Sequence, residues 1–296
     1  MRTRTCIDFD WRFSLGDFPS AINGSFDDSD WRLVDLPHDW SIEADPHPDN
    51  PAQAGGGFFP GGLGWYRKQL DVPADLGDRR MLIEFDGVYQ CSEVWCNGKF
   101  CGQRPYGYSS FCYDLTPYVK AGESAMVAVR VDNSRQKNSR WYSGSGIYRH
   151  VWLTIAEPIR VGHWGTFITT PDVSEASATV KCEVTLTNDT MTSVPVEVVA
   201  SLVGEAADTP TTQFNVPAGA STNTQLELEL LNPKRWSPAT PHLYTLRVEV
   251  KRDGQVIDQY DTRFGVRTIR FDANEGFFLN GENIKMKGMN EHHDAG

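Results

Sequence analysis

Hydrophobic and polar residues alternate along much of the chain, and between residues 65 and 153 they do so in short runs. The runs lie at residues 81–85, 92–96, 110–113 and 125–131. Turn residues separate them, and Asn97-Gly98 is the dipeptide most typical of a type I′ hairpin, because both residues tolerate a positive φ. Short strands with frequent turns and no long helical period predict a β-sandwich of the jelly-roll kind. We expect this first domain to span residues 1–156.

A second set of strand-like runs begins after Glu157-Pro158. Its members lie at residues 161–169, 178–187, 194–203, 212–216, 222–230, 243–250 and 255–260. This number and spacing are typical of an immunoglobulin-like sandwich, here without the disulfide, because Cys182 has no partner cysteine in the stretch. Few of these residues carry chemistry, so we interpret residues 157–267 as a spacer domain that positions its neighbours.

The last stretch, residues 268–296, contains a small hairpin at residues 277–282 and then an apolar strand at residues 283–289. The expected fold class is therefore all-β, with two sandwiches in series and a further strand after them.

Residues 38–64 are too rich in glycine and proline for regular structure. They include four prolines and glycine runs at residues 55–57 and 61–62. Long loops inside a compact domain are usually functional or disordered. Because Phe58 and Phe59 are interleaved with the glycines, we expect an ordered loop that lines a site. Order imposed only by packing or by a neighbouring subunit is the alternative.

Composition argues against several classes of binding partner and against a membrane-spanning segment. The formal net charge of −11 argues against nucleic acid or an anionic membrane surface. No apolar run approaches the ~18–20 residues of a membrane span, and acidic residues interrupt the N-terminus where a signal peptide needs an apolar run. The cysteines, Cys6, Cys91, Cys96, Cys101, Cys112 and Cys182, lack metal-ligand spacing. We interpret them as reduced, mostly buried thiols, and expect a cytoplasmic protein without metal or cofactor.

Residues 139–153 combine side chains that suit a carbohydrate site. Arg140 offers a planar fork of donors to hydroxyl groups, and Trp141 and Tyr142 offer flat faces to the C–H face of a pyranose. Two glycines let the backbone approach closely. From Ile147 the segment alternates like a strand. The alternative from composition alone is a glycine-rich corner of the sandwich, with Trp141 and Tyr142 in the core.

The same segment resembles the end of the N-terminal sugar-binding domain of family 2 glycoside hydrolases, the family of β-galactosidases and β-glucuronidases. Further motifs agree with that family, in the same order, along nearly the whole chain. They are Leu36-Pro37-His38-Asp39-Trp40, Gly64-Trp65-Tyr66-Arg67, Phe85-Asp86-Gly87-Val88, Trp95-Cys96-Asn97-Gly98, Tyr113-Asp114-Leu115-Thr116, Trp236-Ser237-Pro238, Phe264-Gly265-Val266-Arg267, Asn280-Gly281 and Lys287-Gly288-Met289-Asn290. The resemblance implies a sugar-binding jelly roll, an immunoglobulin-like sandwich and, at residues 268–296, the first strand of an incomplete (β/α)₈ barrel, which needs about 250 residues.

The resemblance also implies where the chemistry lies. Family 2 enzymes are retaining hydrolases whose two catalytic glutamates lie about 5–5.5 Å apart on later barrel strands. Both are expected beyond Gly296, so no catalytic residue is assigned in this sequence. Arg140 and Trp141 are implied to reach the sugar. Asn290 and His292 match the Asn-x-His of the family, which implies a contact of His292 with substrate hydroxyls.

This sequence departs from the β-galactosidase pattern in one respect, since no acidic residue closely precedes the tryptophan of the segment. Asp39, Asp132 and Asn133 are the polar residues that can substitute for it, and the alternative role for each is to cap a turn at a strand end. A metal at residues 292–294, His-His-Asp, is not expected, because adjacent residues of a strand point in opposite directions.

We therefore expect the N-terminal, non-catalytic portion of a β-galactosidase-like enzyme, inactive by itself. β-Glucuronides are the alternative substrates. A stand-alone carbohydrate-binding module and one half of a split enzyme are the alternative functions. The expected partners are a β-galactoside at the barrel mouth, the missing barrel in cis or in trans, and further copies of the chain in a homo-oligomer of the full-length enzyme.

Overall fold

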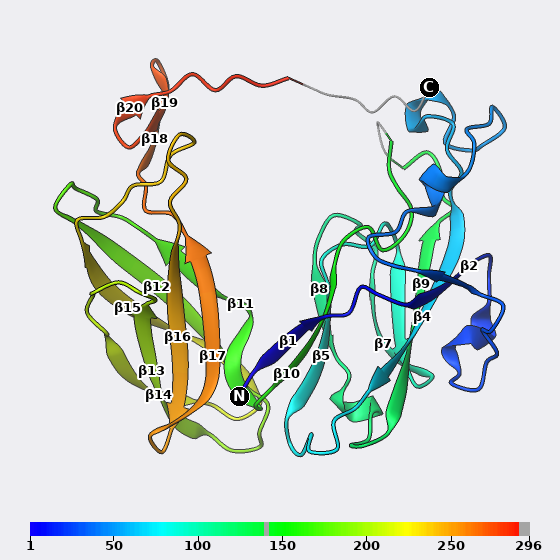
Figure 1. Ribbon diagram of the computed structural model, residues 1–296, viewed down its shortest axis with the longest axis horizontal. Helices are drawn as coiled ribbons and strands as arrows, with labels where there is room; N and C mark the ends of the chain where they lie inside the picture. The colour runs from blue at the N-terminus through cyan, green and yellow to red at the C-terminus, as the bar shows by residue number, and fades with distance from the viewer. Residues whose placement is uncertain (139–141, 290–296) are drawn as a thin grey trace. The chain divides into compact units, whose positions relative to one another are not determined.

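The computed structural model describes residues 1–138 and 142–289. Strands dominate these residues (Figure 1), and the described part of the chain forms two compact units, residues 3–155 and residues 1–2 with 156–289. No helix within the described ranges has the length and apolar character that crossing a membrane requires. The predicted all-β class is confirmed.

Within residues 3–138 and 142–155, ten strands form two sheets around one core. The sheet orders are β3-β2-β4-β9-β6-β7 and β1-β10-β5-β8. The strands are β1 (Thr3–Cys6), β2 (Trp11–Leu15), β3 (Arg32–Val34), β4 (Gly62–Asp71), β5 (Arg80–Phe85), β6 (Ser92–Cys96), β7 (Lys99–Arg104), β8 (Phe111–Asp114), β9 (Ser124–Asn133) and β10 (Val151–Ala156). Trp11, Phe85 and Val129 are fully buried in the shared core. The predicted sandwich is confirmed, and its jelly-roll connectivity stays a prediction.

Short 3-10 helices occupy the connections of this unit. They are η1 (Pro19–Ile22), η2 (Trp40–Glu43), η3 (Ala54–Gly56) and η4 (Thr116–Tyr118). The segment 38–64 contains η2 and η3, and hydrogen bonds join its two ends. The indole Nε1 of Trp40 donates to the carbonyl oxygen of Gly61 at 3.2 Å. The hydroxyl of Ser41 donates to the carbonyl oxygen of Pro60 at 2.6 Å. The glycine- and proline-rich segment is therefore an ordered loop.

Within residues 156–289, seven strands form a second sandwich, of sheets β11-β12-β15 and β14-β13-β16-β17. The strands are β11 (Ile159–Thr169), β12 (Ser177–Asn188), β13 (Val194–Leu202), β14 (Thr211–Val216), β15 (Ala220–Leu231), β16 (Tyr244–Arg252) and β17 (Gln255–Phe264). In β12 every second residue from Ala178 to Leu186 is buried. The valine and leucine side chains among them each contribute about 1.5–3 kcal/mol. The predicted seven-stranded sandwich is confirmed.

After this sandwich the described residues form a small antiparallel sheet of β18 (Ile269–Asp272), β19 (Gly276–Leu279) and β20 (Glu282–Asn283). β19 and β20 are the predicted hairpin. The apolar strand predicted at residues 283–289 is wrong: β20 ends at Asn283, and residues 284–289 are in no strand. Met286 is 68% exposed. An apolar run becomes a strand only where a neighbouring strand pairs its backbone. The N–H of Ile284 still donates to Phe277 in β19 at 2.9 Å, but no described strand pairs with residues 285–289.

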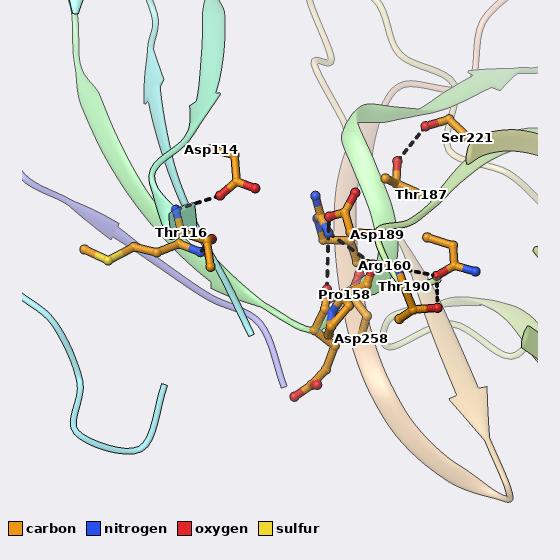
Figure 2. A network of polar contacts seen from close by, with 12 residues as sticks. Asp114, Thr116, Pro158, Arg160, Thr187, Asp189, Thr190, Ser221 and Asp258 are labelled. Atoms are coloured by element: carbon orange, nitrogen blue, oxygen red, sulfur yellow. Dashed lines mark hydrogen bonds and ion pairs between the residues drawn. The ribbon is translucent and has the colours of Figure 1, made fainter. Parts of the chain in front are cut away.

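Buried ion pairs fix the start of the second unit. Arg2 donates two hydrogen bonds, of 3.0 and 2.9 Å, to the fully buried carboxylate of Asp258 in β17. The buried Arg160 in β11 donates to Asp189 at 2.5 Å (Figure 2). A buried charge is costly unless it is paired and hydrogen-bonded. These pairs therefore hold the N-terminal residues and the first strand of the sandwich in place.

All six cysteines are free thiols, as predicted, but the prediction that most are buried is wrong. Only Cys96 and Cys182 are buried, which raises the pKa of Cys96 to about 11 and that of Cys182 to about 12. Cys6, Cys101 and Cys112 lie in β1, β7 and β8, which are edge strands of their sheets. A residue of an edge strand is covered by a neighbouring strand on one side only, so these thiols are half-exposed.

Candidate functional site

A cavity of about 640 Å³ lies in the unit of residues 3–155, between η2, the loop that follows it and the segment after residue 141. Six of its lining residues are Asp39, Ser41, Asp45, Phe59, Tyr142 and Ser143. Hydroxyl, carboxyl and aromatic groups thus face one space. The glycine-rich loop contributes Asp45 and Phe59, so this loop lines the cavity, as the sequence predicts.

Asp39 is fixed by two backbone hydrogen bonds. Its Oδ1 accepts the N–H of Ser41 at 2.9 Å, which caps the N-terminus of η2, and the N–H of Ser145 at 2.7 Å. Burial raises the pKa of Asp39, and the bonds from Ser145 and Ser41 hold it down in part. Gly144 approaches the carboxylate so closely that a Cβ at this position would collide with it. The carboxylate is therefore held rigidly at the cavity wall.

Beneath the cavity, side-chain hydrogen bonds join the residues on both sides of positions 139–141. The hydroxyl of the buried Ser145 lies 2.6 Å from Ser41 Oγ and accepts from Asn133 Nδ2 at 2.7 Å. Asn133 Oδ1 in turn accepts from Asn138 Nδ2 at 2.6 Å. Networks in which every buried member has a partner specify one conformation. The described residues that precede and follow positions 139–141 are thus anchored to η2 and to β9.

His38 supports the turn that carries Asp39. Its Nδ1 lies 2.6 Å from the hydroxyl of Tyr66, and its Nε2 lies 2.9 Å from Arg32 and 3.1 Å from Glu43. Burial lowers the pKa of His38, against the attraction of the Glu43 carboxylate, so the imidazole is neutral at pH 7. We assign His38 a structural role, because it contacts core and surface residues and does not line the cavity.

The aromatic part of the cavity consists of Phe59 and Tyr142, whose ring centroids are 5.8 Å apart in an edge-to-face arrangement. Gly57, with a φ of +65°, lies directly against the Tyr142 ring, where any side chain would collide. Tyr142 is partly buried. An aromatic ring in this position can cover the apolar face of a sugar.

The structure places one of the predicted site residues, Asp39, in the cavity. Arg140 and Trp141, and likewise Asn290 and His292, lie outside the described residues, and their roles stay predictions.

The two alternatives to Asp39 have structural roles. Asp132 Oδ1 accepts the backbone N–H of Ser134 at 3.0 Å, and so caps a turn. Asn133 is buried in the network beneath the cavity. Sequence reasoning missed Ser41 and Asp45. The signal for Ser41 was its position two residues after a potential helix-capping aspartate.

Among the described residues, one trio of potential metal ligands comes together: Cys6, Asp8 and His150. None of the three lines the cavity.

Comparison with models of protein families shows to which family the chain belongs. Residues 5–157 match the model of the sugar binding domain of glycosyl hydrolases family 2, and residues 163–267 match a further model of glycosyl hydrolases family 2. The chain belongs to glycosyl hydrolase family 2. The two matched segments correspond to the two sandwiches.

Relatives in the family extend over nearly the whole chain. A β-galactosidase of Bacteroides ovatus is 48% identical over 100% of this chain, which spans 35% of that protein. A crystal structure of a family 2 member from Bacteroides cellulosilyticus is similar with a TM-score of 0.91 and 36% identity, over 96% of this chain and 38% of that one. A β-glucuronidase of Bacteroides uniformis is similar with a TM-score of 0.85 and 29% identity, over 98% of this chain and 35% of that one. The chain thus spans about a third of the length of these relatives.

Proposed function

We propose that this chain is the N-terminal, non-catalytic portion of a retaining β-galactosidase-like glycoside hydrolase, which hydrolyses terminal β-galactosides. Its role is to contribute a wall of the sugar site through Asp39, Arg140 and Trp141. His292 contacts substrate hydroxyls, and Asn290 shapes the strand end beside it as part of the substrate-binding site. The catalytic glutamates belong to the barrel and not to these 296 residues. The domains are residues 1–156 for sugar binding, 157–267 as spacer and 268–296 as the start of the barrel.

The feature that supports this function most directly is the cavity lined by Asp39, Tyr142 and Ser143. Tyr142 and Ser143 directly follow residues 139–141 in the sequence. An anchored carboxylate, hydroxyl groups and an aromatic face are the groups that bind a pyranose. Among the described lining residues, the hydroxyl of Ser41 faces the carbonyl oxygen of Pro60 and the hydroxyl of Ser145, neither of which is a general base of the kind that activates a nucleophile. The cavity suits binding and positioning, with bond cleavage left to the barrel.

The charge of the cavity favours a neutral sugar over a uronic acid. Asp39 and Asp45 both line it, and the chain carries a formal net charge of −11. A glucuronide carboxylate brought beside these groups would be repelled, since like charges at short range destabilise one another. The 48% identical relative is a β-galactosidase, which agrees with this preference. β-Glucuronides are the second candidate, because a similar structure is that of a β-glucuronidase.

The test is hydrolysis of a chromogenic β-galactoside, with the matching β-glucuronide alongside. The purified chain is assayed alone and after mixing with the remaining C-terminal portion of the Bacteroides ovatus relative. We expect no turnover by the chain alone, and turnover of the galactoside after mixing. Turnover by the chain alone would overturn the non-catalytic assignment. Preference for the glucuronide would overturn the choice of sugar.

A pair of variants tests the role of Asp39 in the mixed sample. Asp39→Asn keeps the size of the side chain and removes its charge, so kcat/KM is expected to fall about tenfold or more, the effect of losing a hydrogen bond to a charged group. Asp49→Asn changes a carboxylate that is 92% exposed and serves as control. Equal activity of the two variants would exclude Asp39 from the sugar site.

Binding of galactoside by the chain without any gain of turnover on mixing would favour the stand-alone module instead.

We further propose that the full-length enzyme is a cytoplasmic homo-oligomer that joins this portion to its barrel in cis or in trans. The free thiols of the chain support a reducing compartment.

A further inference from the structure

The pairing of β1 with β10 brings together three residues that are up to 144 positions apart. Cys6 lies opposite Trp152 in the antiparallel register. Continuing that register by two residues places Asp8 opposite His150, and the backbone N–H of Ile7 donates to Val151 between them at 2.9 Å. Because side chains alternate across a strand, positions 6, 8 and 150 share one face. The sheet therefore gathers a thiol, a carboxyl and an imidazole at one edge.

The three side chains gather around the carboxyl group of Asp8. His150 Nδ1 lies 2.6 Å from Asp8 Oδ2. One ligand atom from each of the three residues, including the sulfur of Cys6, lies within 4.8 Å of the other two. With bonds of about 2.3 Å to sulfur and about 2.0–2.1 Å to nitrogen and oxygen, a tetrahedral Zn²⁺ needs its ligand atoms about 3–4 Å apart. Side-chain movements of about 1 Å or less reach that geometry.

The neighbouring backbone orients the Asp8 ligand, and the exposed His150 leaves the site open to an ion from solvent. Asp8 is 4% exposed, and its Oδ1 accepts the backbone N–H of Val151 at 2.8 Å. Such an outer contact orients a ligating carboxylate. The side chain of His150 is 54% exposed. An ion can therefore enter from solvent, and a fourth coordination position stays open for water.

We propose that Cys6, Asp8 and His150 form a binding site for one Zn²⁺ ion. A thiolate, an imidazole and a carboxylate are together the ligand types that Zn²⁺ takes in proteins, and the thiolate disfavours Mg²⁺ and Ca²⁺, which prefer oxygen. The sites of magnesium and calcium are built from oxygen ligands alone or nearly so. This inference is independent of the proposed function.

The guanidinium of Arg4 does not block the site. Arg4, two residues before Cys6, donates to Glu84 at 3.1 Å and lies 3.8 Å from the centroid of the Trp152 ring. Its charge is compensated by the carboxylate of Glu84. The trio itself carries a carboxylate and gains a thiolate on binding, so two ligand charges balance those of Zn²⁺.

In the metal-free protein, the Nδ1 of His150 faces the Asp8 carboxylate at 2.6 Å. Because Zn²⁺ is bound by a thiolate and by an unprotonated imidazole nitrogen, the ion replaces the protons on these two ligand atoms, which leave to solvent or move to Nε2 of His150. The affinity for Zn²⁺ is therefore expected to rise with pH.

The trio does not have the arrangement of a cysteine nucleophile. Such a nucleophile needs the thiol hydrogen-bonded to the base, with the carboxylate behind the imidazole. Here the Nδ1 of His150 faces Asp8, and burial together with the neighbouring Asp8 raises the pKa of Cys6. A raised pKa makes a thiol a weak nucleophile.

The test uses Co²⁺ as a spectroscopic substitute for Zn²⁺ on the full chain under reducing conditions. We expect a thiolate-to-cobalt charge-transfer band in the near ultraviolet, visible bands typical of tetrahedral Co²⁺, saturation at one ion per chain, and loss of both signals when Zn²⁺ is added. Cys6→Ser is expected to abolish the charge-transfer band. His150→Gln, at an exposed position, is expected to weaken binding by more than about tenfold, the low end of what losing even an outer-shell partner costs.

Cys91→Ser is the matched control, because it removes an exposed thiol outside the trio. Its band and affinity are expected to equal those of the unmodified chain. Absence of the band in the unmodified chain, or a band that survives Cys6→Ser and disappears in Cys91→Ser, would overturn the site.

Discussion

Asp39 and Ser145 are 106 residues apart in the sequence, and the carboxylate Oδ1 of Asp39 accepts the backbone N–H of Ser145 at 2.7 Å. The same oxygen caps η2 through Ser41. One atom thus joins the loop that lines the cavity to the segment that directly follows residues 139–141. The geometry of the cavity wall depends on this bond.

Replacing Asp39 by alanine is expected to lower the free energy of unfolding by about 1–3 kcal/mol, because the backbone donors of Ser41 and Ser145 lose their acceptor. Asp39→Asn keeps an acceptor oxygen and removes a buried charge, so its loss is expected to stay below about 1 kcal/mol. Urea unfolding followed by tryptophan fluorescence measures both. Equal losses in the two variants would show that the charge, and not the hydrogen bonds, stabilises the wall.

Much of the fold could be predicted from alternation alone. In β12, polar and aliphatic residues alternate from Ala178 to Leu186, and the sandwich buries the aliphatic ones as the pattern requires. Alternation does not say whether a strand has a neighbour. Residues 284–289 are as apolar as many strands, yet no described strand pairs with them beyond Ile284, and they are not a strand. The alternation of polar and apolar residues shows which face of a strand is buried, but it does not show which element covers that face.

The candidate site could be predicted only in part. Asp39 was found through a motif, but its partner Ser145 lies far away in sequence, and only the sheet brings the two together. The trio of Cys6, Asp8 and His150 was missed for the same reason. Spacing rules for metal ligands apply within one loop or helix, whereas here the register of two strands from opposite ends of the domain creates the proximity.

His38 is expected to make stability depend on pH. Burial lowers its pKa in the folded state from the usual 6.5, so below that pH the unfolded chain binds a proton that the folded chain does not. The free energy of unfolding is therefore unaffected by this group above pH 6.5, and falls as the pH drops from 6.5 through the lowered folded-state pKa. His38→Gln is expected to reduce this slope in urea titrations between about pH 8 and pH 5. His47→Gln, at a residue that is 65% exposed, is the control and should leave the slope unchanged.

Arg2→Ala is expected to destabilise the second sandwich by about 3–5 kcal/mol, because it leaves the fully buried carboxylate of Asp258 without its cation. Burial already raises the pKa of Asp258 in spite of Arg2, and removing the guanidinium raises it further. The loss should therefore be larger at neutral pH than in acid, where the carboxyl group is protonated.

The double variant Arg2→Ala, Asp258→Asn is expected to regain part of this loss, since the amide oxygen still accepts the N–H of Val161 and carries no charge. Arg252→Ala serves as control, because its ion pair with Asp253 is exposed. A double variant no more stable than Arg2→Ala would mean that packing of the Arg2 side chain, and not its charge, holds the N-terminus.

Gly146 is expected to tolerate no side chain. Its φ is +136°, its N–H and C=O exchange hydrogen bonds of 2.9 Å with Tyr89, and a Cβ would collide with the hydroxyl of Tyr66 and the carbonyl of His38. Gly146→Ala therefore combines backbone strain of about 1–3 kcal/mol with overpacking of about 1–3 kcal/mol, and we expect a loss above about 2 kcal/mol. Gly24→Ala, where nothing lies within 4 Å of the added carbon, should change stability by less than about 1 kcal/mol. If urea unfolding gave equal values for the two variants, the close approach of Gly146 to the turn at His38 would not be what fixes this part of the cavity.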